Sequence, residues 1–540
     1  TGSLFTLAGT AAVVATVGWT QPAAAQLTDA EAMGELTLAP WAGPTPGFTD
    51  VAFLSDGRAV ITNKNGTIAV VGKDGMAVKA MAGRIMVDTG SEKGLLGVVV
   101  DSSDNVYFYA SSGPSNADKH RVHKGRVAAD GTVTIDTNLV VMGGLEGPAN
   151  HDGGGMVIHK GQLYIGVGDT GANATPPRNK YGSCLNKPNG KILRVNLDGT
   201  IPTDNPLSNV AMATSCTSTT GGNYEMAPPD KRIYSWGFRN PWRLWIDPET
   251  DLMWVGDVGE GTEEEITVGG KGTHHGYPFN EGKVNYPSGV GGLNDCKMMM
   301  PPTDCVAPQD SYKHNGASAS VTGGLAPVKG CGWGAYEGRY FFGDYNKHEI
   351  YTVQMTPDRK GAVPGSRKTI GTARNNVSFR QGPDGAIYIV SHEPGIVHRL
   401  APKMIPANCK AAGPDGGTGG PDAGAPDASS GAGGSGGSGP SPNAGGASGS
   451  GGRAGGSPGG NSGGTTGGSS TGGTSGGSSS GGRSGGSNTG GSAGSAPSGG
   501  GGGGGCSVAG AGAGGSAAGA GLMLAAVGFA IRRRRRRKAD

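Results

Sequence analysis

The chain has 540 residues, of which 108 are glycine, and its formal net charge at pH 7 is +3. Both features are uneven: residues 413–505 contain 43 glycines and no aromatic residue, and the basic run at 532–538 carries +7. Residues 1–412 hold 36 Lys and Arg against 38 Asp and Glu. Composition therefore excludes a single globular domain over the whole length. It also excludes a nucleic-acid-binding domain, because the positive charge belongs to the tail.

The first 25 residues have the pattern of a secretory signal. An apolar run at 4–19 is followed by Gln21-Pro22 and by alanines at 23–25, which predicts cleavage near the Ala25–Gln26 bond. The alternative, a short membrane anchor, is disfavoured because the apolar run is too short to span a bilayer comfortably. We expect residues 1–25 to be a signal peptide and the protein to be exported.

Residues 36–410 show short apolar alternations separated by Asp-Gly and related turns, for example LSDGRAVITNKNGTIAVVGKDG and GPDGAIYIVSHEPGIVHRL. Period-two alternation of Val, Ile and Tyr between Gly, Asn and Asp is typical of strands and hairpins. Groups of four strands every 50–65 residues or so indicate a β-propeller. The predicted fold is all-β, a six-bladed propeller; a stacked pair of β-sandwiches is the alternative.

One glycine-rich loop contains a candidate general base. His151 precedes three glycines, where backbone can approach a ligand closely, and a neutral imidazole accepts a proton near pH 7. Asp169, at the end of the next predicted strand, would fix the tautomer of the ring if the fold brings the two together. The alternative interpretation is an exposed turn histidine.

Two further loops carry groups that suit an anionic or metal-bound ligand. Arg239-Asn240 on a proline turn offers a forked cation and an amide for a developing oxyanion, and the alternative is an arginine paired with an acidic loop. Glycine-rich residues 259–261 can present carbonyl oxygens to calcium, although most such loops are simple turns. The glutamates at 263–265 are interpreted as a solvated charge run rather than as metal ligands.

Seven ordered motifs resemble the glucose/sorbosone dehydrogenase family, which includes soluble pyrroloquinoline quinone (PQQ) sugar dehydrogenases and hedgehog-interacting-protein-like proteins. The motifs are EKGLLG, H-x-GG, LYIGVGDTG, NGKILRVNLDG, GFRNPWRLWIDPETDLMWVGDVGEGTEEEI, GYP and GPDGAIYIV, between about residues 47 and 400. The resemblance implies a six-bladed propeller whose loops on one face hold PQQ and Ca²⁺, with a sugar as substrate.

The resemblance also implies roles for individual residues. His151 is similar to the base that takes the proton of the substrate hydroxyl, with Asp169 orienting it, and Arg239 and Asn240 to the pair that stabilises charge on the quinone oxygen. The remaining positions implied are quinone contacts at Glu92, Asn150 and Lys347, and calcium ligands at the backbone carbonyls of Gly259 and Glu260.

The chain departs from the soluble glucose enzymes at one place. Those enzymes carry two arginines that hold the carboxylates of the quinone, where this sequence has Asn375 and Val377. Arg374 and Arg380 are the nearby arginines that could substitute. The segment around residues 321–345 is more similar to the hedgehog-interacting-protein-like branch.

Seven cysteines fit an exported protein. Six lie in the globular part and none forms Cys-x-x-Cys, which favours disulfides over a zinc ribbon or a c-type haem. Six cysteines allow fifteen pairings, and Cys184–Cys216 and Cys296–Cys305 are the pairs that are close in sequence. Since no haem motif is present, electrons from an oxidised substrate would pass to an external acceptor.

The C-terminal part is predicted to be a tether. Residues 411–505 form a Gly/Ser-rich linker that cannot bury a core. Residues 506–540 comprise Cys506, a short apolar stretch and an arginine block, which resembles the myxobacterial C-terminal sorting signal. We expect attachment to the cell surface or outer envelope through this segment, with processing near Cys506; a permanent single-pass anchor is the alternative.

Two functions follow from these expectations. The first is a surface-tethered quinoprotein that oxidises a sugar hydroxyl or hemiacetal by hydride transfer to PQQ. The second is a catalytically inactive propeller that binds a carbohydrate or a protein.

Overall fold

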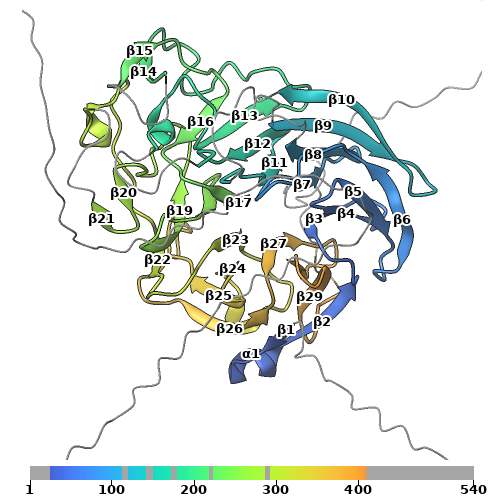
Figure 1. Ribbon diagram of the computed structural model, residues 1–540. Coiled ribbons are helices and arrows are strands. Elements are labelled where there is room, and N and C mark those ends of the chain that lie inside the picture. Colours follow the sequence, from blue (N-terminus) through green and yellow to red (C-terminus); the bar gives the residue numbers. More distant parts are fainter. Residues whose placement is uncertain are drawn as a thin grey trace, which may run out of the picture. The chain divides into compact units, whose positions relative to one another are not determined.

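The computed structural model describes residues 25–111, 120–141, 150–171, 179–217, 223–285, 292–407 and 409. In this part of the chain the strands form six antiparallel blades around a central axis, which confirms the predicted propeller (Figure 1). The residues at 1–24, the predicted linker at 411–505 and the predicted C-terminal segment at 506–540 lie outside the described residues.

The first three blades follow one another in sequence. Blade 1 is β3 (Phe48–Phe53), β4 (Ala59–Asn63), β5 (Thr67–Val71) and β6 (Ala77–Arg84). Blade 2 is β7 (Leu95–Val100), β8 (Asn105–Ser111), β9 (His120–Val127) and β10 (Val133–Val141). Blade 3 is β11 (Met156–His159), β12 (Gln162–Val167), β13 (Lys191–Asn196) and β16 (Ile233–Trp236).

The other three blades complete the ring. Blade 4 is β17 (Pro241–Ile246), β18 (Met253–Asp257), β19 (Glu263–Gly269) and β22 (Asp310–Lys313). Blade 5 is β23 (Val321–Leu325), β24 (Arg339–Asp344), β25 (Glu349–Gln354) and β26 (Lys368–Ala373), with β1 (Ala25–Leu27) paired outside β26. Blade 6 is β27 (Asn376–Gln381), β28 (Ile387–Ser391), β29 (Ile396–Pro402) and β2 (Leu36–Ala42).

Smaller elements decorate the blades. They are the hairpins β14 (Ala213–Ser215) with β15 (Glu225–Ala227) and β20 (Asn280–Glu281) with β21 (Val284–Asn285), the helix α1 (Ala30–Glu35), and 3-10 turns at Tyr181–Ser183, Cys296–Met298 and Gly334–Tyr336. No helix among the described residues is both long and apolar enough to cross a membrane.

The ring is closed by β2, the strand that precedes blade 1 in the sequence. β2 pairs antiparallel with β29, from Leu36 opposite Pro402 to Ala42 opposite Val397, so the outer strand of the last blade comes from the start of the propeller. The fold begins before the predicted boundary at residue 36, because β1 pairs with β26 and α1 follows it. The side chain of Asp29 caps α1 by accepting a hydrogen bond from the Ala32 amide at 2.9 Å.

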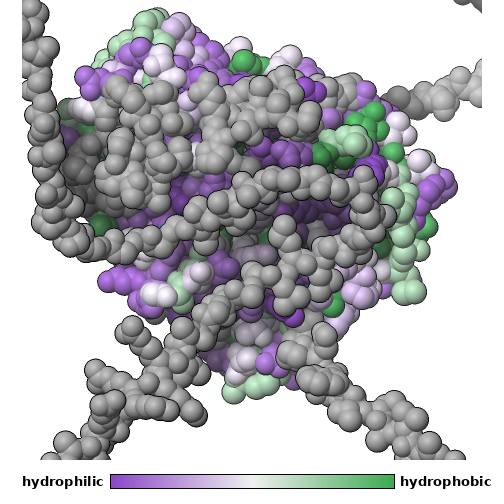
Figure 2. Space-filling view, in the orientation of Figure 1, coloured by the Kyte–Doolittle hydropathy of each residue, from purple (hydrophilic) through white to green (hydrophobic). Residues whose placement is uncertain are grey.

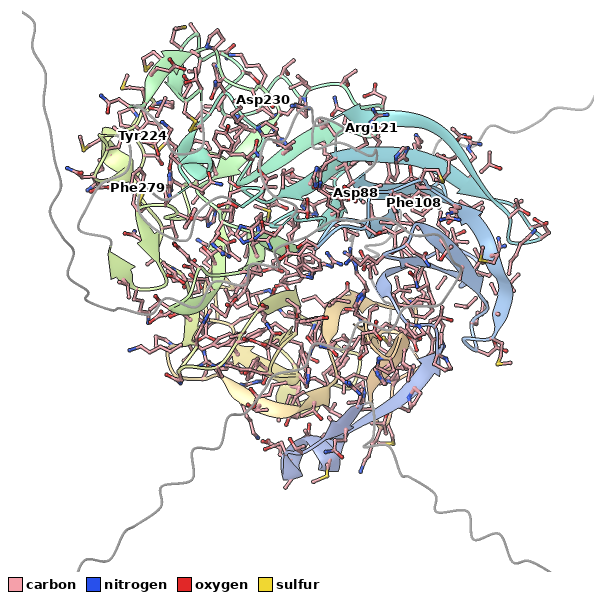
Figure 3. The ribbon with its side chains drawn as sticks, in the orientation of Figure 1. Asp88, Phe108, Arg121, Tyr224, Asp230 and Phe279 are labelled. Carbon is pink, nitrogen blue, oxygen red and sulfur yellow. A yellow bond between two sulfur atoms is a disulfide. The ribbon has the colours of Figure 1, made fainter. Side chains whose placement is uncertain are left out.

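Alternating side chains of one strand pack against two different neighbouring blades. In β8, Val106, Phe108 (labelled in Figure 3) and Ala110 belong to the core shared with blade 1, while Tyr107 and Tyr109 belong to the core shared with blade 3. Both faces of such a strand are buried, which explains why β8 is a continuous run of apolar and aromatic residues from Val106 to Ala110. Truncating one of these aromatic rings to alanine would cost about 3–5 kcal/mol of stability.

Three disulfides link loops of the propeller. The two pairs predicted from proximity, Cys184–Cys216 and Cys296–Cys305, are both present. The third joins Cys331, in the loop before β24, to Cys409 at the end of the described chain. This third bond closes a segment of 78 residues, so it restricts the unfolded chain most strongly of the three.

A buried ion cluster formed by Asp50, Arg243 and Arg380, here called the axial cluster, crosses the channel between the blades. The Nε of Arg380 donates to Asp50 Oδ1 at 2.9 Å, and Arg243 Nη2 donates to the Thr49 carbonyl at 2.8 Å. Burial by itself would raise the pKa of Asp50, but the charges of Arg380 and Arg243 hold that pKa below its usual value. Burial lowers the pKa of Arg243 to about 10, with Asp50 opposing the shift.

Candidate active site

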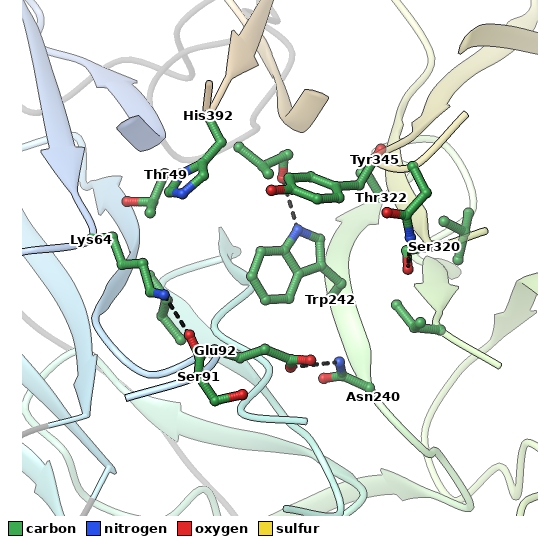
Figure 4. Close-up of a pocket in the computed structure, with 15 residues that line it drawn as sticks. Thr49, Lys64, Ser91, Glu92, Asn240, Trp242, Ser320, Thr322, Tyr345 and His392 are labelled. Atoms are coloured by element: carbon green, nitrogen blue, oxygen red, sulfur yellow. Dashed lines mark hydrogen bonds between the residues drawn. The ribbon is translucent and has the colours of Figure 1, made fainter. Parts of the chain in front are cut away.

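A cavity of about 310 Å³ lies at one end of the channel, where the inner strands begin. Its walls include Thr49 of β3, Glu92 before β7, Trp242 of β17, Thr322 of β23 and Val377 of β27 (Figure 4). Hydrophilic side chains predominate on the described surface around the centre of the ring in the view of Figure 2. The cavity, here called the axial pocket, is of the size that binds small molecules.

The candidate base His151 is held by Asp169. His151 Nδ1 lies 2.7 Å from Asp169 Oδ1, and the imidazole is mostly buried. His151 has a φ of 60°, the left-handed region, and its carbonyl accepts from the Thr170 amide at 3.2 Å. A side chain at Gly168 would place a Cβ 2.0 Å from the His151 carbonyl oxygen, so the close approach of the two loops requires glycine there. The structure therefore brings together the two residues that the sequence placed 18 positions apart.

The His151 loop is connected to the axial pocket by Glu92 and Asn240. The His151 amide donates to Glu92 Oε2 at 2.7 Å, and Asn240 Oδ1 accepts from the Gly153 amide at 3.1 Å. Asn240 Nδ2 lies 3.5 Å from the same Glu92 oxygen (Figure 4). Glu92 and Asn240 both line the pocket, whereas His151 is not among its lining residues, so the predicted base is linked to the pocket through these two side chains.

Asp257, at the end of β18, positions the Arg239-Asn240 corner. Its two carboxylate oxygens accept from the amides of Arg239 and Asn240 at 3.0 Å and 2.7 Å. Burial raises the pKa of Asp257 to about 7, while the hydrogen bonds from the two backbone amides oppose that shift. The guanidinium Nη1 of Arg239 donates to the Val258 carbonyl at 2.9 Å. The arginine thus contacts the backbone of the acidic loop, and Val258 itself lines the pocket.

The pKa of the Arg239 guanidinium is raised. Burial would lower it, but Tyr277 and the carboxylates of Asp169 and Glu260 outweigh burial. A half-buried arginine that keeps its charge beside a pocket can stabilise negative charge on a ligand.

The loop predicted to bind calcium is organised around the buried carboxylate of Glu281. Glu281 Oε1 accepts from four successive amides, of residues 260, 261, 262 and 263, at 2.7, 2.8, 2.9 and 3.3 Å. In a trans peptide the C=O of one residue points opposite to the N–H of the next. The carbonyls of Gly259 and Glu260 therefore point away from Glu281, as separate oxygens that a cation could bind.

The interpretation of residues 263–265 as a solvated charge run is wrong. Glu263, Glu264 and Glu265 are 6%, 0% and 7% exposed. Glu264 Oε2 accepts from the Val321 amide at 2.8 Å and its Oε1 lies 2.7 Å from His314 Nε2. Burial raises the pKa of Glu265 well above its usual value, with Asp257 adding to the shift. The three glutamates are buried because β22 pairs with β19 and because the turn directly after β20 packs on β19, where the Gly282 amide donates to Glu265.

Two predicted quinone contacts lie in different settings. Asn150 Oδ1 is buried without a hydrogen-bond partner among the described residues, so it can accept from a ligand. The Nζ of Lys347 donates to the Lys313 carbonyl at 3.3 Å and lies over the Tyr312 ring at 4.6 Å. The neighbours Tyr345 and Asn346, rather than Lys347, are among the residues that line the axial pocket.

Asn375 and Val377, the two positions where the expected arginines are absent, lie in different surroundings. Val377 lines the pocket, and its carbonyl accepts from Trp242 Nε1 at 2.9 Å. Asn375 has a φ of 47° and its amide donates to His348 Nδ1 at 3.1 Å. Arg374 is exposed, and Arg380 is engaged by Asp50 in the axial cluster. Neither of these arginines substitutes for the pair in the pocket.

Sequence reasoning missed four residues that shape the site. Asp257 and Glu281 accept hydrogen bonds from backbone amides, a role that no local sequence pattern predicts. Trp242 presents an indole to the pocket, and its place directly after the Arg-Asn-Pro corner was a usable signal (Figure 4). Lys64 follows β4 and lines the pocket, although its turn looks like any other hairpin turn in the sequence.

The fold and site define a class: a six-bladed propeller with an axial pocket that is linked by hydrogen bonds to a His–Asp pair and an Arg-Asn corner. A family model described as glucose/sorbosone dehydrogenase matches residues 45–399. The chain belongs to the glucose/sorbosone dehydrogenase family.

Curated relatives match at moderate identity. The chain is 28% identical over 217 residues to quinoprotein glucose dehydrogenase B of Acinetobacter calcoaceticus, covering 36% of this chain and 41% of the relative. It is 24% identical over 245 residues to aldose sugar dehydrogenase YliI of Escherichia coli K12, covering 45% and 58%. It is 29% identical over 256 residues to HIPL1 of Arabidopsis thaliana, covering 43% and 34%. The alignments thus span less than two thirds of each of these relatives.

Solved structures share the fold. The apo form of the soluble aldose sugar dehydrogenase of Escherichia coli matches with a TM-score of 0.53 at 20% identity, covering 68% of this chain and all of that one. The PQQ-bound form of an aldose sugar dehydrogenase from Streptomyces coelicolor matches with a TM-score of 0.50 at 18% identity, covering 68% and 98%.

Proposed function

We propose that this protein is a PQQ-dependent sugar dehydrogenase that oxidises a hydroxyl or hemiacetal of an aldose-type sugar. The observation that carries the proposal is the 2.7 Å contact between His151 Nδ1 and Asp169 Oδ1, joined through Glu92 to the axial pocket. Family membership supports it, as do relatives named aldose sugar dehydrogenase and quinoprotein glucose dehydrogenase.

The residues present fit a planar, anionic quinone and a cation. The axial pocket offers the indole of Trp242 as a flat wall and Lys64 as a positive charge. The unpartnered Asn150 Oδ1 is an acceptor for a ligand, and the carbonyls of Gly259 and Glu260 are oxygens of the kind calcium prefers. When bound, PQQ supplies a two-electron acceptor for the hydride that leaves the sugar carbon.

The chain's own residues would handle the proton and the developing charge. Asp169 accepts from Nδ1 of His151, which leaves Nε2 as the ring nitrogen that takes the proton of the sugar hydroxyl. Arg239 and Asn240, whose backbone is fixed by Asp257, would stabilise negative charge that develops on the ligand. Glu92 holds the His151 backbone, so base and pocket keep a constant separation.

One observation favours the second candidate, a propeller that binds a ligand without turnover. The apolar Val377 lines the pocket wall where the soluble glucose enzymes place one of two arginines. Such a protein would bind a carbohydrate or protein at the same face and would reduce no acceptor.

A quinone titration separates the two candidates. The protein with calcium is titrated with PQQ by absorbance, and the loaded protein is then tested for dye reduction with a panel of aldoses. We expect saturable binding and sugar-dependent reduction. Binding without reduction of dye by any sugar would favour the silent propeller, and absence of PQQ binding would exclude the dehydrogenase.

The role of His151 is tested by His151→Ala against a matched control. We expect a loss of turnover of about 10²–10⁴-fold with PQQ affinity little changed, because only proton transfer is removed. His159→Ala removes another histidine of the same blade that lies 2.7 Å from an aspartate, Asp251, and should leave turnover intact. Equal losses in both variants would assign His151 to structure alone.

We further propose that the protein is exported and held at the cell surface by residues 506–540, and that a separate acceptor takes the electrons. The Gly/Ser-rich linker supports this, since it would space the propeller from an envelope. The intact mass of the protein from its source cells tests processing. Loss of the arginine block would support cleavage near Cys506, and a mass that includes it would favour the permanent anchor.

A further inference from the structure

The axial pocket contains few groups that could hold an anionic ligand. PQQ carries carboxylates, and a carboxylate taken out of water needs a cation or several hydrogen-bond donors. The wall at Val377 is apolar, Arg374 is exposed, and Arg380 is committed to Asp50. The cationic partner must therefore come from elsewhere in the chain.

Lys64 is a cation in the right place. It directly follows β4 in blade 1, is half-buried, and is the single lysine or arginine among the described residues that line the axial pocket. Its Nζ donates to the Ser91 carbonyl, which fixes the side chain across the pocket from Tyr345 (Figure 4). An ammonium has three donors, so this contact leaves others for a ligand.

We propose that Lys64 is the cationic anchor for a carboxylate of the bound quinone, so that blade 1 supplies the charge that the soluble glucose enzymes take from the loop before the last blade. The inference rests on the proposed function. It predicts that the anionic edge of the ligand lies on the Lys64 side of Trp242 rather than against Val377.

The groups around Lys64 would make the charge of its ammonium depend on whether an anion is bound beside it. Burial lowers the pKa of Lys64, and the carboxylates of Glu92 and Asp152 oppose that shift. His392 also lines the pocket; its Nδ1 donates to the Phe48 carbonyl at 2.9 Å. Burial lowers the pKa of His392; the hydrogen bond to the Phe48 carbonyl and the charge of Glu393 oppose that shift, and the charge of Lys64 adds to it. A ligand carboxylate beside Lys64 would raise the pKa of the ammonium again.

The experiment compares PQQ affinity among four proteins with calcium and without sugar, by calorimetry and absorbance. They are the natural chain, Lys64→Met, Lys64→Arg and the control Lys73→Met, which alters an exposed lysine on the next turn of the same blade. We expect Lys64→Met to weaken binding about 10- to 100-fold, the effect of losing one charge-assisted hydrogen bond. Lys64→Arg should keep most of the affinity, and Lys73→Met all of it.

A pH series adds a readout that a structural role would not move. As the pH rises from neutral towards the usual lysine pKa of about 10.4, the affinity of the natural chain should fall, because burial lowers the pKa of Lys64 and the ammonium loses its proton, and the affinity of Lys64→Met should stay flat. Equal affinity of Lys64→Met and the natural chain, or the same pH slope in both, would overturn the anchor while leaving the proposed function intact. No PQQ binding by the natural chain would overturn both.

Discussion

Two buried clusters of charged residues in the propeller differ in what stabilises their carboxylates. In the axial cluster, Asp50 is paired with the side-chain cations of Arg380 and Arg243, and its pKa lies below the usual value. Under the candidate calcium loop, Asp257 and Glu265 are held by backbone amides and have raised pKa values. We call the second group, with Glu263, Glu264 and Glu281, the carboxylate cluster.

The difference shows what each cluster can do. A carboxylate with a cation at hand stays ionised and is static, which suits the axial cluster to closing the channel behind the pocket. Carboxyl groups held mainly by backbone amides, with raised pKa values, give up their protons more readily when a cation approaches, which suits the carboxylate cluster to supporting a cation on the adjacent carbonyls. The following substitutions test this contrast.

The largest effect is expected from breaking the axial cluster. Arg380→Met leaves Asp50 buried with its best partner removed, so the free energy of unfolding should fall by about 3–5 kcal/mol. Urea unfolding followed by tryptophan fluorescence measures it. The double variant Arg380→Met with Asp50→Asn should recover a large part of the loss, because no unpaired charge remains. A single variant as stable as the natural chain would show that Arg243 alone suffices for Asp50.

A smaller effect is expected from Glu281 in the carboxylate cluster. Glu281→Ala leaves four amides without their acceptor, but water can reach part of this loop, so the cost should be about 2 kcal/mol. Glu281→Gln keeps an acceptor oxygen and should cost about 1 kcal/mol. Chemical unfolding of both variants measures the difference. A Gln variant as unstable as the Ala variant would mean that the negative charge, and not the hydrogen bonds, holds the loop.

The sequence predicted the fold because the relevant signals are local. The alternation in β8 and the Asp-Gly turns between strands depend on neighbours within a few residues, and the two short-range disulfides follow from proximity. The pairing of His151 with Asp169 was predictable because the two loops flank β11 and β12, one hairpin. What a single blade encodes can be predicted from its sequence.

The contacts between distant blades could not be predicted in this way. Glu263–Glu265 are buried because β22 and Glu281 cover them, and nothing in the run itself signals that cover. Lys64 lines the pocket because the loop at Ser91, from the next blade, folds over it. Both errors concern charged residues, for which burial depends on partners supplied by the tertiary structure.

The smallest effect is expected from His314, which provides the carboxylate cluster with a titratable cation. The hydrogen bond to Glu264 raises the pKa of His314; burial and Lys347 oppose the shift, and Glu281 adds to it. A raised folded pKa stabilises the protein below the unfolded value of about 6.5, and this contribution is lost as pH rises through the folded pKa. His314→Gln should therefore be less stable than the natural chain near pH 6, by up to about 1 kcal/mol, with the gap closing as the pH rises through the folded pKa. Urea unfolding across this range measures the gap. A gap that widens with pH would mean that the neutral imidazole is the stabilising form and that the cluster keeps its charge uncompensated at every pH.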